Sequence, residues 1–209
     1  MGAVTAIEPD PRRSACVRIH VAGRPCYTVP RESVAAAGIT IGTAIDERAH
    51  ETLGRAADAE AAFRAALGAL ELRSYARADL GRRLVRRGHP RAAVEAALAR
   101  AAEHGLLDDA KFAEDFIESR SVRGRGPLRL QRDLSAMGVA RQTIDAAIAA
   151  HWPEGAENPD VPLALARKRA AQLGALPRTV KRRRLLAYLA RRGFTGRTIT
   201  TIVSRVLEG

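Results

Sequence analysis

The first regular pattern along the chain is an alternation of apolar and polar residues near the N-terminus. Val17, Ile19 and Val21 share one face of an extended segment, and Tyr27 and Val29 resume the period of two after a short Ala-Gly-Arg loop. A period of two on both sides of a glycine-containing loop is typical of a β-hairpin. The sequence therefore predicts a hairpin over this segment.

The register of that hairpin follows from the requirement that its apolar side chains share one face. A loop of three residues, 22–24, meets this requirement. In that register Cys16 lies near Pro30 and Cys26 lies near His20, so the two cysteines are not partners. We expect neither a disulfide nor a metal site there, because too few ligands are present. The expected pairs are Val21 with Pro25, Ile19 with Tyr27, and Val17 with Val29.

From about Asp46 to the end of the chain, apolar residues recur with helical spacing. Phe63, Leu67 and Leu70 stand at positions i, i+4 and i+7, which lie on one face of a helix. Residues 153–162 interrupt this helical periodicity, because their sequence PEGAENPDVP combines proline, glycine and acidic residues without regularly spaced apolar residues. Such a composition is typical of a linker.

The helical part contains an internal repeat. When Gly88, Gly138 and Gly193 are aligned, aliphatic residues recur 8 and 4 residues before each glycine and 6 and 10 residues after it. The first two lie on one face of a helix that the glycine ends, and the last two lie on one face of the next helix. The recurring residues are Leu80, Leu84, Val94 and Leu98, then Leu130, Leu134, Ile144 and Ile148, then Leu185, Leu189, Ile199 and Val203.

Each of these helix pairs follows a further amphipathic segment, so the repeating unit is a three-helix module that occurs three times. The predicted fold class is mainly α: three tandem three-helix, helix-turn-helix-like repeats in an elongated array, with a small N-terminal β-hairpin. The expected divisions are 1–55 for the hairpin segment, 56–106 and 107–152 for the first two repeats, 153–162 for the linker, and 163–209 for the third repeat.

The charge of the chain is strongly positive and unevenly distributed. The formal net charge is +12, from 35 Lys and Arg against 23 Asp and Glu. Residues 1–72 hold 8 basic and 9 acidic side chains, whereas residues 73–209 hold 27 and 14. A neutral first part followed by a basic body attracts polyanions through its long-range field. Nucleic acid is the leading candidate partner, and an acidic protein surface is the second.

The basic residues gather in clusters that the leucine pattern keeps off the core faces. The middle repeat places its cluster around a Gly-Arg-Gly turn that leads into a helix, which suits phosphate or carboxylate contacts. A single arginine on a helix surface is usually a solvated charge. The clustering of arginines, rather than any one of them, therefore predicts binding to a polyanion. The candidate binding residues are Arg82, Arg83, Arg86, Arg87, Arg120, Arg123, Arg125, Arg129, Arg132, Lys181, Arg182, Arg183, Arg184, Arg191 and Arg192.

One run of residues resembles a known family. Residues 103–114, with the sequence EHGLLDDAKFAE, resemble the "GLLDD-x-x-FAE" segment of the RecX family. Residues 80–88 resemble its first-repeat pattern "L-x-x-x-L-x-x-x-G", residues 124–127 its "(K/R)G-x-GP" turn, and residues 189–194 its third-repeat pattern "L-x-x-(K/R)GF". The resemblance covers roughly residues 60–209.

The resemblance implies a regulatory protein of the RecA recombinase that is not an enzyme. Proteins of this family bind RecA filaments on DNA and inhibit ATP hydrolysis, strand exchange and repressor co-cleavage. The implied roles are in DNA repair, homologous recombination and the SOS response. The resemblance also implies weaker, accessory binding to single- and double-stranded DNA. On this view the arginine clusters face the filament surface or the DNA backbone.

A stand-alone helix-turn-helix DNA-binding protein is the alternative hypothesis. Such proteins read bases with the helix that follows the turn. Here the basic residues stand before the glycines, and the helix after Gly138 offers few side chains that could read bases. The RecA regulator therefore remains the preferred interpretation.

The sequence shows no catalytic or cofactor-binding motif. The five histidines are scattered, and no glycine-rich loop ends in Lys-Ser or Lys-Thr. Asp108 and Asp109 could ligate a metal, but they stand where a helix cap is expected. The N-terminus is unlike a signal peptide, and the presence of only two cysteines is typical of a protein in a reducing compartment. No apolar run approaches the ~20 residues of a membrane span. We expect a cytoplasmic monomer without enzymatic activity, cofactor or membrane contact.

Overall fold

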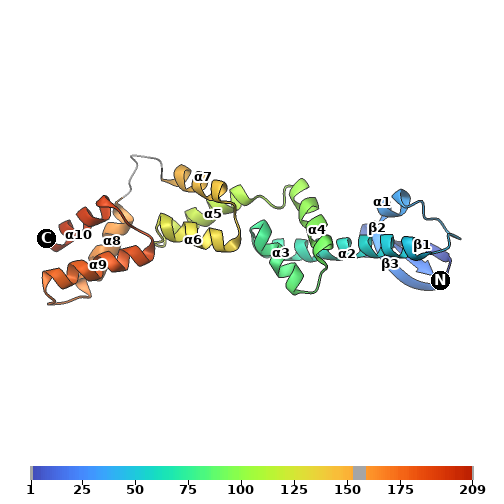
Figure 1. The fold of residues 1–209 in the computed structure, drawn as a ribbon, viewed down its shortest axis with the longest axis horizontal. Coiled ribbons are helices and arrows are strands. Elements are labelled where there is room, and N and C mark those ends of the chain that lie inside the picture. Colours follow the sequence, from blue (N-terminus) through green and yellow to red (C-terminus); the bar gives the residue numbers. More distant parts are fainter. Residues whose placement is uncertain (1, 153–158, 209) are drawn as a thin grey trace. The chain divides into compact units, whose positions relative to one another are not determined.

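A computed structural model describes residues 2–152 and 159–208. These residues form one antiparallel sheet and ten helices (Figure 1). The chain divides into two compact units, Met1–Leu107 and Asp108–Gly209, and each is described separately below. Within the described residues, no helix has the length and apolar character that crossing a membrane requires.

The N-terminal sheet has three strands rather than the two predicted. Strands β1 (Val4–Asp10), β2 (Arg13–Val21) and β3 (Arg24–Pro30) pair in that order, all antiparallel. The hairpin itself is confirmed for β2 and β3, and β1 pairs with the other side of β2. Strand β1 could not be recognised from its sequence, because its residues do not alternate cleanly and it includes Pro9, which an edge strand tolerates.

The predicted register is correct in the middle of the hairpin and wrong at its loop. Ile19 pairs with Tyr27 as expected, but Val21 pairs with Arg24 instead of Pro25. The loop therefore has two residues, Ala22 and Gly23, with φ angles of 49° and 78°. A two-residue turn with positive φ angles matches the twist of a hairpin better than a three-residue loop does. A bulge after Ile19 then restores the predicted register in the middle of the hairpin.

The two cysteines are free and differ in their surroundings. Cys16 pairs with Pro30 in the sheet and is 2% exposed, whereas Cys26 is exposed. Burial raises the pKa of the Cys16 thiol to about 11, and the nearby carboxyl of Glu60 adds to this rise. The Cys16 thiol is therefore protonated at neutral pH and behaves as a small core residue.

The sheet packs on a short helix, α1 (Arg31–Ala36), and on the first part of the long helix α2 (Glu47–Leu70). Leu53 of α2 belongs to the same core as Ile19 and Val29 of the sheet. The later part of α2 packs in the core of the first module, through Phe63 and other residues. The predicted division between residues 55 and 56 thus lies inside one continuous helix.

Three helices form each module. In the first unit, α2 packs with α3 (Arg77–Arg86) and α4 (Arg91–Glu103). In the second unit, α5 (Asp109–Ser121), α6 (Pro127–Met137) and α7 (Arg141–His151) form one group. Helices α8 (Asp160–Ala171), α9 (Arg178–Arg192) and α10 (Arg197–Glu208) form another, with a core of their own. The predicted three tandem modules are confirmed.

Part of the predicted linker is helical. Helix α8 begins at Asp160, two residues before the expected end of the linker, and Pro162 is buried in its first turn. Proline is compatible with a first helical turn because the amide it lacks would have no helical partner there. Residues 153–158 of the predicted linker lie outside the described residues.

The three glycines that define the repeat adopt the same conformation. Gly88, Gly138 and Gly193 have φ angles of 94°, 88° and 92°, in the left-handed region that favours glycine. The amide after each glycine donates to the carbonyl of the leucine four residues before it, at 3.3, 3.2 and 3.0 Å. This is the Schellman pattern of helix termination. The six leucines that precede the glycines at the repeat positions are completely buried.

Candidate anion-binding site between the second and third modules

The candidate arginines on α3 lie in the first unit. Arg82 pairs with Asp79 at 3.3 Å, and the guanidinium of Arg83 lies 5.8 Å from the centre of the Tyr75 ring. Arg86 and Arg87 are exposed near the end of α3. The leucine pattern predicted this arrangement, since Leu80 and Leu84 occupy the core face of the same helix.

Six of the candidate arginines line one pocket in the second unit, with a volume of about 390 Å³. Four come from the second module and two from the third. Along the sequence these residues fall in separate clusters, and the structure brings them together. The lining residues are Arg120, Arg123, Arg125, Arg129, Arg191 and Arg192.

Close packing of two backbone segments produces this convergence. The amide of Gly126 donates to the carbonyl of Arg192 at 2.7 Å, and the amide of Leu128 donates to the carbonyl of Gly193 at 3.3 Å. The first amides of α6 therefore find their acceptors at the end of α9, where carbonyls would otherwise lack partners. Gly126 is the N-cap of α6 and has no capping side chain, so α9 supplies the cap.

Both segments require glycine for this contact. A Cβ atom on Gly126 would lie 2.6 Å from the carbonyl carbon of Gly193, and a Cβ atom on Gly193 would lie 2.4 Å from the amide nitrogen of Arg129. Such distances are too short for any side chain. The Gly-Arg-Gly turn is thus packed against the end of α9.

The pocket is strongly positive because few acidic groups balance its arginines. Asp133 accepts from Arg125 at 2.6 Å and pairs with Arg129 at 3.1 Å. Arg192 uses the same terminal nitrogen to reach the carbonyls of Arg123 and Gly124, at 3.4 and 3.5 Å. Within the described part of the chain, neither Arg123 nor Arg191 forms an ion pair, and both are exposed. Guanidinium groups remain charged at any physiological pH, so the pocket attracts anions.

One arginine at the pocket has an unused donor. The guanidinium carbon of Arg120 lies 4.4 Å from the centre of the Phe116 ring, which holds the side chain by a cation–π contact. The Nε atom of Arg120 is buried and has no hydrogen-bond partner among the described residues. A buried donor without a partner costs free energy, and Arg120 is one of the residues that line the pocket.

The remaining candidates lie outside this pocket. Arg132 is exposed on α6, and its Nε donates to the carbonyl of Leu128 at 3.1 Å. The other four stand in the first half of α9, ahead of the two arginines that line the pocket. They are Lys181, Arg182, Arg183 and Arg184.

Asp108 acts as a helix cap, as its position ahead of a helical segment predicts. Its carboxylate accepts from the amides of Ala110 and Lys111, at 2.8 and 3.0 Å, at the start of α5. In residues 2–152 and 159–208, no three His, Cys, Asp or Glu side chains gather in a way that could hold a metal ion.

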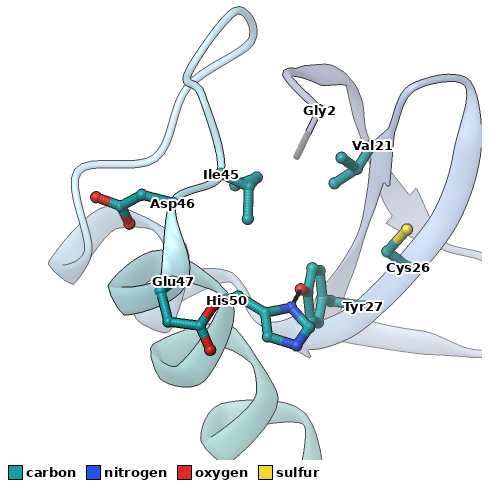
Figure 2. Close-up of a pocket in the computed structure, with 8 residues that line it drawn as sticks. All are labelled: Gly2, Val21, Cys26, Tyr27, Ile45, Asp46, Glu47 and His50. Atoms are coloured by element: carbon teal, nitrogen blue, oxygen red, sulfur yellow. Dashed lines mark hydrogen bonds between the residues drawn. The ribbon is translucent and has the colours of Figure 1, made fainter.

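A second pocket lies in the first unit, between the sheet and the start of α2 (Figure 2). The hydroxyl of Tyr27 and the Nδ1 atom of His50 face each other there and form a hydrogen bond. Burial raises the pKa of Tyr27. Asp46 also lines this pocket, but its carboxylate caps α2 through the amide of Ala49. Tyr27, His50 and Asp46 thus have partners within the protein, and none of the candidate arginines lines this pocket.

Comparison with known proteins places this chain in a family. A model described as "RecX, second three-helix domain" matches residues 108–148. A regulatory protein RecX of Xanthomonas axonopodis pv. citri (strain 306) is 36% identical over 148 residues, which is 68% of this chain and 86% of the relative. This chain belongs to the RecX family. A regulatory protein RecX of Stenotrophomonas maltophilia (strain R551-3) is 37% identical over 138 residues, 64% of this chain and 80% of the relative.

Two solved structures of RecX proteins share the fold. A crystal structure of a regulatory protein RecX superposes with a TM-score of 0.80 at 19% identity, over the full length of both chains. The RecX of Lactobacillus salivarius superposes with a TM-score of 0.64 at 18% identity, over 71% of this chain and 96% of the other. The modular RecX architecture is therefore retained while most side chains differ.

Proposed function

We propose that this protein binds RecA filaments on DNA and lowers the activities of the recombinase, namely ATP hydrolysis, strand exchange and co-protease action. Its relatives bear the name regulatory protein RecX, which supports a regulatory role. The observation that carries the proposal is the pocket of six arginines, which offers a concentrated positive surface to a filament of protein and nucleic acid.

The surroundings of the pocket suit a partner that presents both protein and phosphate. Val122 and Leu128 flank the Gly-Arg-Gly turn and are 75% and 44% exposed. Arginine is enriched in protein interfaces and at their binding hot spots, and the exposed aliphatic side chains beside it add apolar area that a partner can bury. We therefore assign this surface to the contact with the filament.

The candidate arginines outside the pocket extend the proposed contact. On α3 they are Arg82, Arg83, Arg86 and Arg87, and on α6 and α9 they are Arg132, Lys181, Arg182, Arg183 and Arg184. Their roles are to attract the acidic filament surface or the DNA backbone over a distance. Weaker binding to free single- and double-stranded DNA follows from the same charges. We further propose that the protein acts in the cytoplasm, where such a target is found, as a monomer and without enzymatic activity.

The direct test is the rate of RecA-dependent ATP hydrolysis on single-stranded DNA. We expect this protein to lower the rate when it is present at much less than one molecule per RecA monomer, because binding to an ordered filament affects many subunits. A variant with Arg82, Arg83, Arg86 and Arg87 changed to Glu should inhibit less. An unchanged rate with the native protein would overturn the proposal.

Salt separates this function from the alternative of a stand-alone DNA-binding protein. Binding that depends only on phosphate contacts weakens steeply as salt rises, by about 10³–10⁵-fold between 50 and 200 mM for 6–10 contacts. A RecA regulator should still inhibit ATP hydrolysis at a salt concentration that removes it from naked DNA. Inhibition that disappears together with DNA binding would favour the alternative.

A further inference from the structure

The arginine pocket is divided between two modules. Arg120, Arg123, Arg125 and Arg129 belong to the second module, whereas Arg191 and Arg192 end α9 of the third. Neither module has the complete site. The pocket exists only when the end of α9 is docked on the turn formed by residues 123–126 and on the start of α6.

The docking contact has opposing contributions. The two backbone hydrogen bonds from Gly126 and Leu128 favour it. The charge opposes it, because docking brings two guanidinium groups of α9 next to four others, and Asp133 is the only carboxylate that pairs with any of the six within the described residues. Like charges held close together repel, most strongly where water is partly excluded. A bound anion therefore lowers this electrostatic cost of docking.

We propose that this pocket is a binding site for the phosphodiester backbone of nucleic acid, and that backbone binding and the docking of α9 stabilise each other. Because the complete site exists only in the docked state, ligand affinity and docking are linked and must change together. This inference rests on the proposed function only in taking nucleic acid as the polyanion.

The composition of the pocket favours a phosphate backbone over other anions. A nucleic-acid strand has a negative charge on every nucleotide, and guanidinium groups bind phosphate oxygens in a bidentate manner. All six lining residues are arginines, so the pocket offers no aromatic ring on which a base could stack. We expect it to bind the backbone without regard to base sequence.

The central test removes the docking contact and keeps every arginine. In Gly126→Ala the backbone is not strained, because Gly126 has φ −84° and ψ 168°, but the new Cβ would collide with Gly193. We expect the affinity of the full chain for d(T)12, measured by fluorescence anisotropy, to fall by about tenfold, within the usual range of coupling between sites. Hydrogen exchange of the Gly126 and Leu128 amides should become faster. The control is Gly68→Ala in α2, where a Cβ meets no neighbour.

A second pair of variants tests docking at the other glycine and guards against misfolding. Gly193→Ala and Gly88→Ala replace equivalent left-handed caps, with φ angles of 92° and 94°. Both carry the same backbone strain, but only Gly193→Ala introduces a collision with Arg129. We expect only Gly193→Ala to weaken d(T)12 binding, while circular dichroism shows both proteins to be folded.

Removing charge should separate the two linked effects. The double variant Arg123→Gln with Arg191→Gln should bind d(T)12 more weakly, yet without DNA its Gly126 amide should exchange more slowly, because repulsion across the docked contact is smaller. The matched control is Arg55→Gln with Arg64→Gln, which makes the same change of charge on the exposed surface of α2. A purely structural role for the arginines predicts faster exchange instead.

Several outcomes would overturn the inference. One is native affinity for d(T)12 in Gly126→Ala despite loss of amide protection. Others are a clear preference between d(T)12 and d(A)12, or displacement of d(T)12 by an eight-residue polyglutamate peptide at equal charge concentration. Inhibition of RecA by the native protein together with any of these results would leave the proposed function intact. If the native protein does not inhibit RecA but DNA binding and docking of α9 are linked, only the proposed function is refuted.

Discussion

Single residues at the repeat positions determine how well each module packs. Leu130 and Leu134 are completely buried on α6, and Ile144 of α7, which packs with α6, is equally buried. Their spacing ahead of Gly138 matches that of leucines in the other two modules. A small module has few such side chains, so each accounts for a large share of its stability.

Truncating one of these leucines should destabilise the protein strongly. For Leu134→Ala we expect a loss of about 2–5 kcal/mol in the free energy of unfolding, because both the transfer energy and the filled volume are lost. Leu72→Ala, at a position that is 82% exposed, should change it by less than about 0.5 kcal/mol. Urea unfolding followed by circular dichroism measures both. A loss below about 1 kcal/mol for Leu134→Ala would contradict the complete burial of Leu134.

At the scale of elements, helix ends are specified more locally than strand pairing. The cap at Asp108 and the three left-handed glycines could be predicted from a few residues, because a cap depends on its own turn. The length of the hairpin loop could not be predicted in this way, since the bulge after Ile19 depends on how β2 pairs with both of its neighbours. Strand β1 was missed for a similar reason: its pairing partner is specified only by the folded sheet.

The cap at Asp108 gives a test at this scale. Asp108→Ala should lower the free energy of unfolding by about 0.5–2 kcal/mol, because two amides at the start of α5 lose their acceptor. Asp108→Asn keeps a capping oxygen and should cost much less. Thermal unfolding with and without Mg²⁺ distinguishes capping from metal binding. If Mg²⁺ stabilises the native protein but neither variant, metal binding by Asp108 is favoured over capping.

At the scale of the whole molecule, the arginine pocket lies entirely in the unit Asp108–Gly209. This unit has 19 basic and 11 acidic residues, and the unit Met1–Leu107 has 16 and 12. Leu107 is buried in the core of the first unit, and Asp108 begins the second as the cap of α5. The chain can therefore be divided between these two residues without cutting a helix or a core.

A fragment of residues 108–209 should fold by itself and keep the affinity of the full chain for d(T)12 within about threefold, since electrostatic attraction depends mainly on local charge at ordinary salt. A fragment of residues 1–107 should bind more weakly. Circular dichroism tests folding and anisotropy tests binding. A folded second fragment with little affinity for d(T)12 would show that the pocket is not the main DNA contact.

The sequence by itself determined the helical modules, their number, the glycines that end a helix in each, and the clustering of arginines away from the cores. These features depend on residues within one or two helical turns, so spacing along the chain reveals them. It did not reveal that arginines from the second and third modules line one pocket. That convergence depends on the fit of Gly126 against Gly193, a contact between residues far apart in the sequence. Only tertiary structure decides such a contact, because it depends on space left by a missing side chain and on carbonyls at the end of another helix.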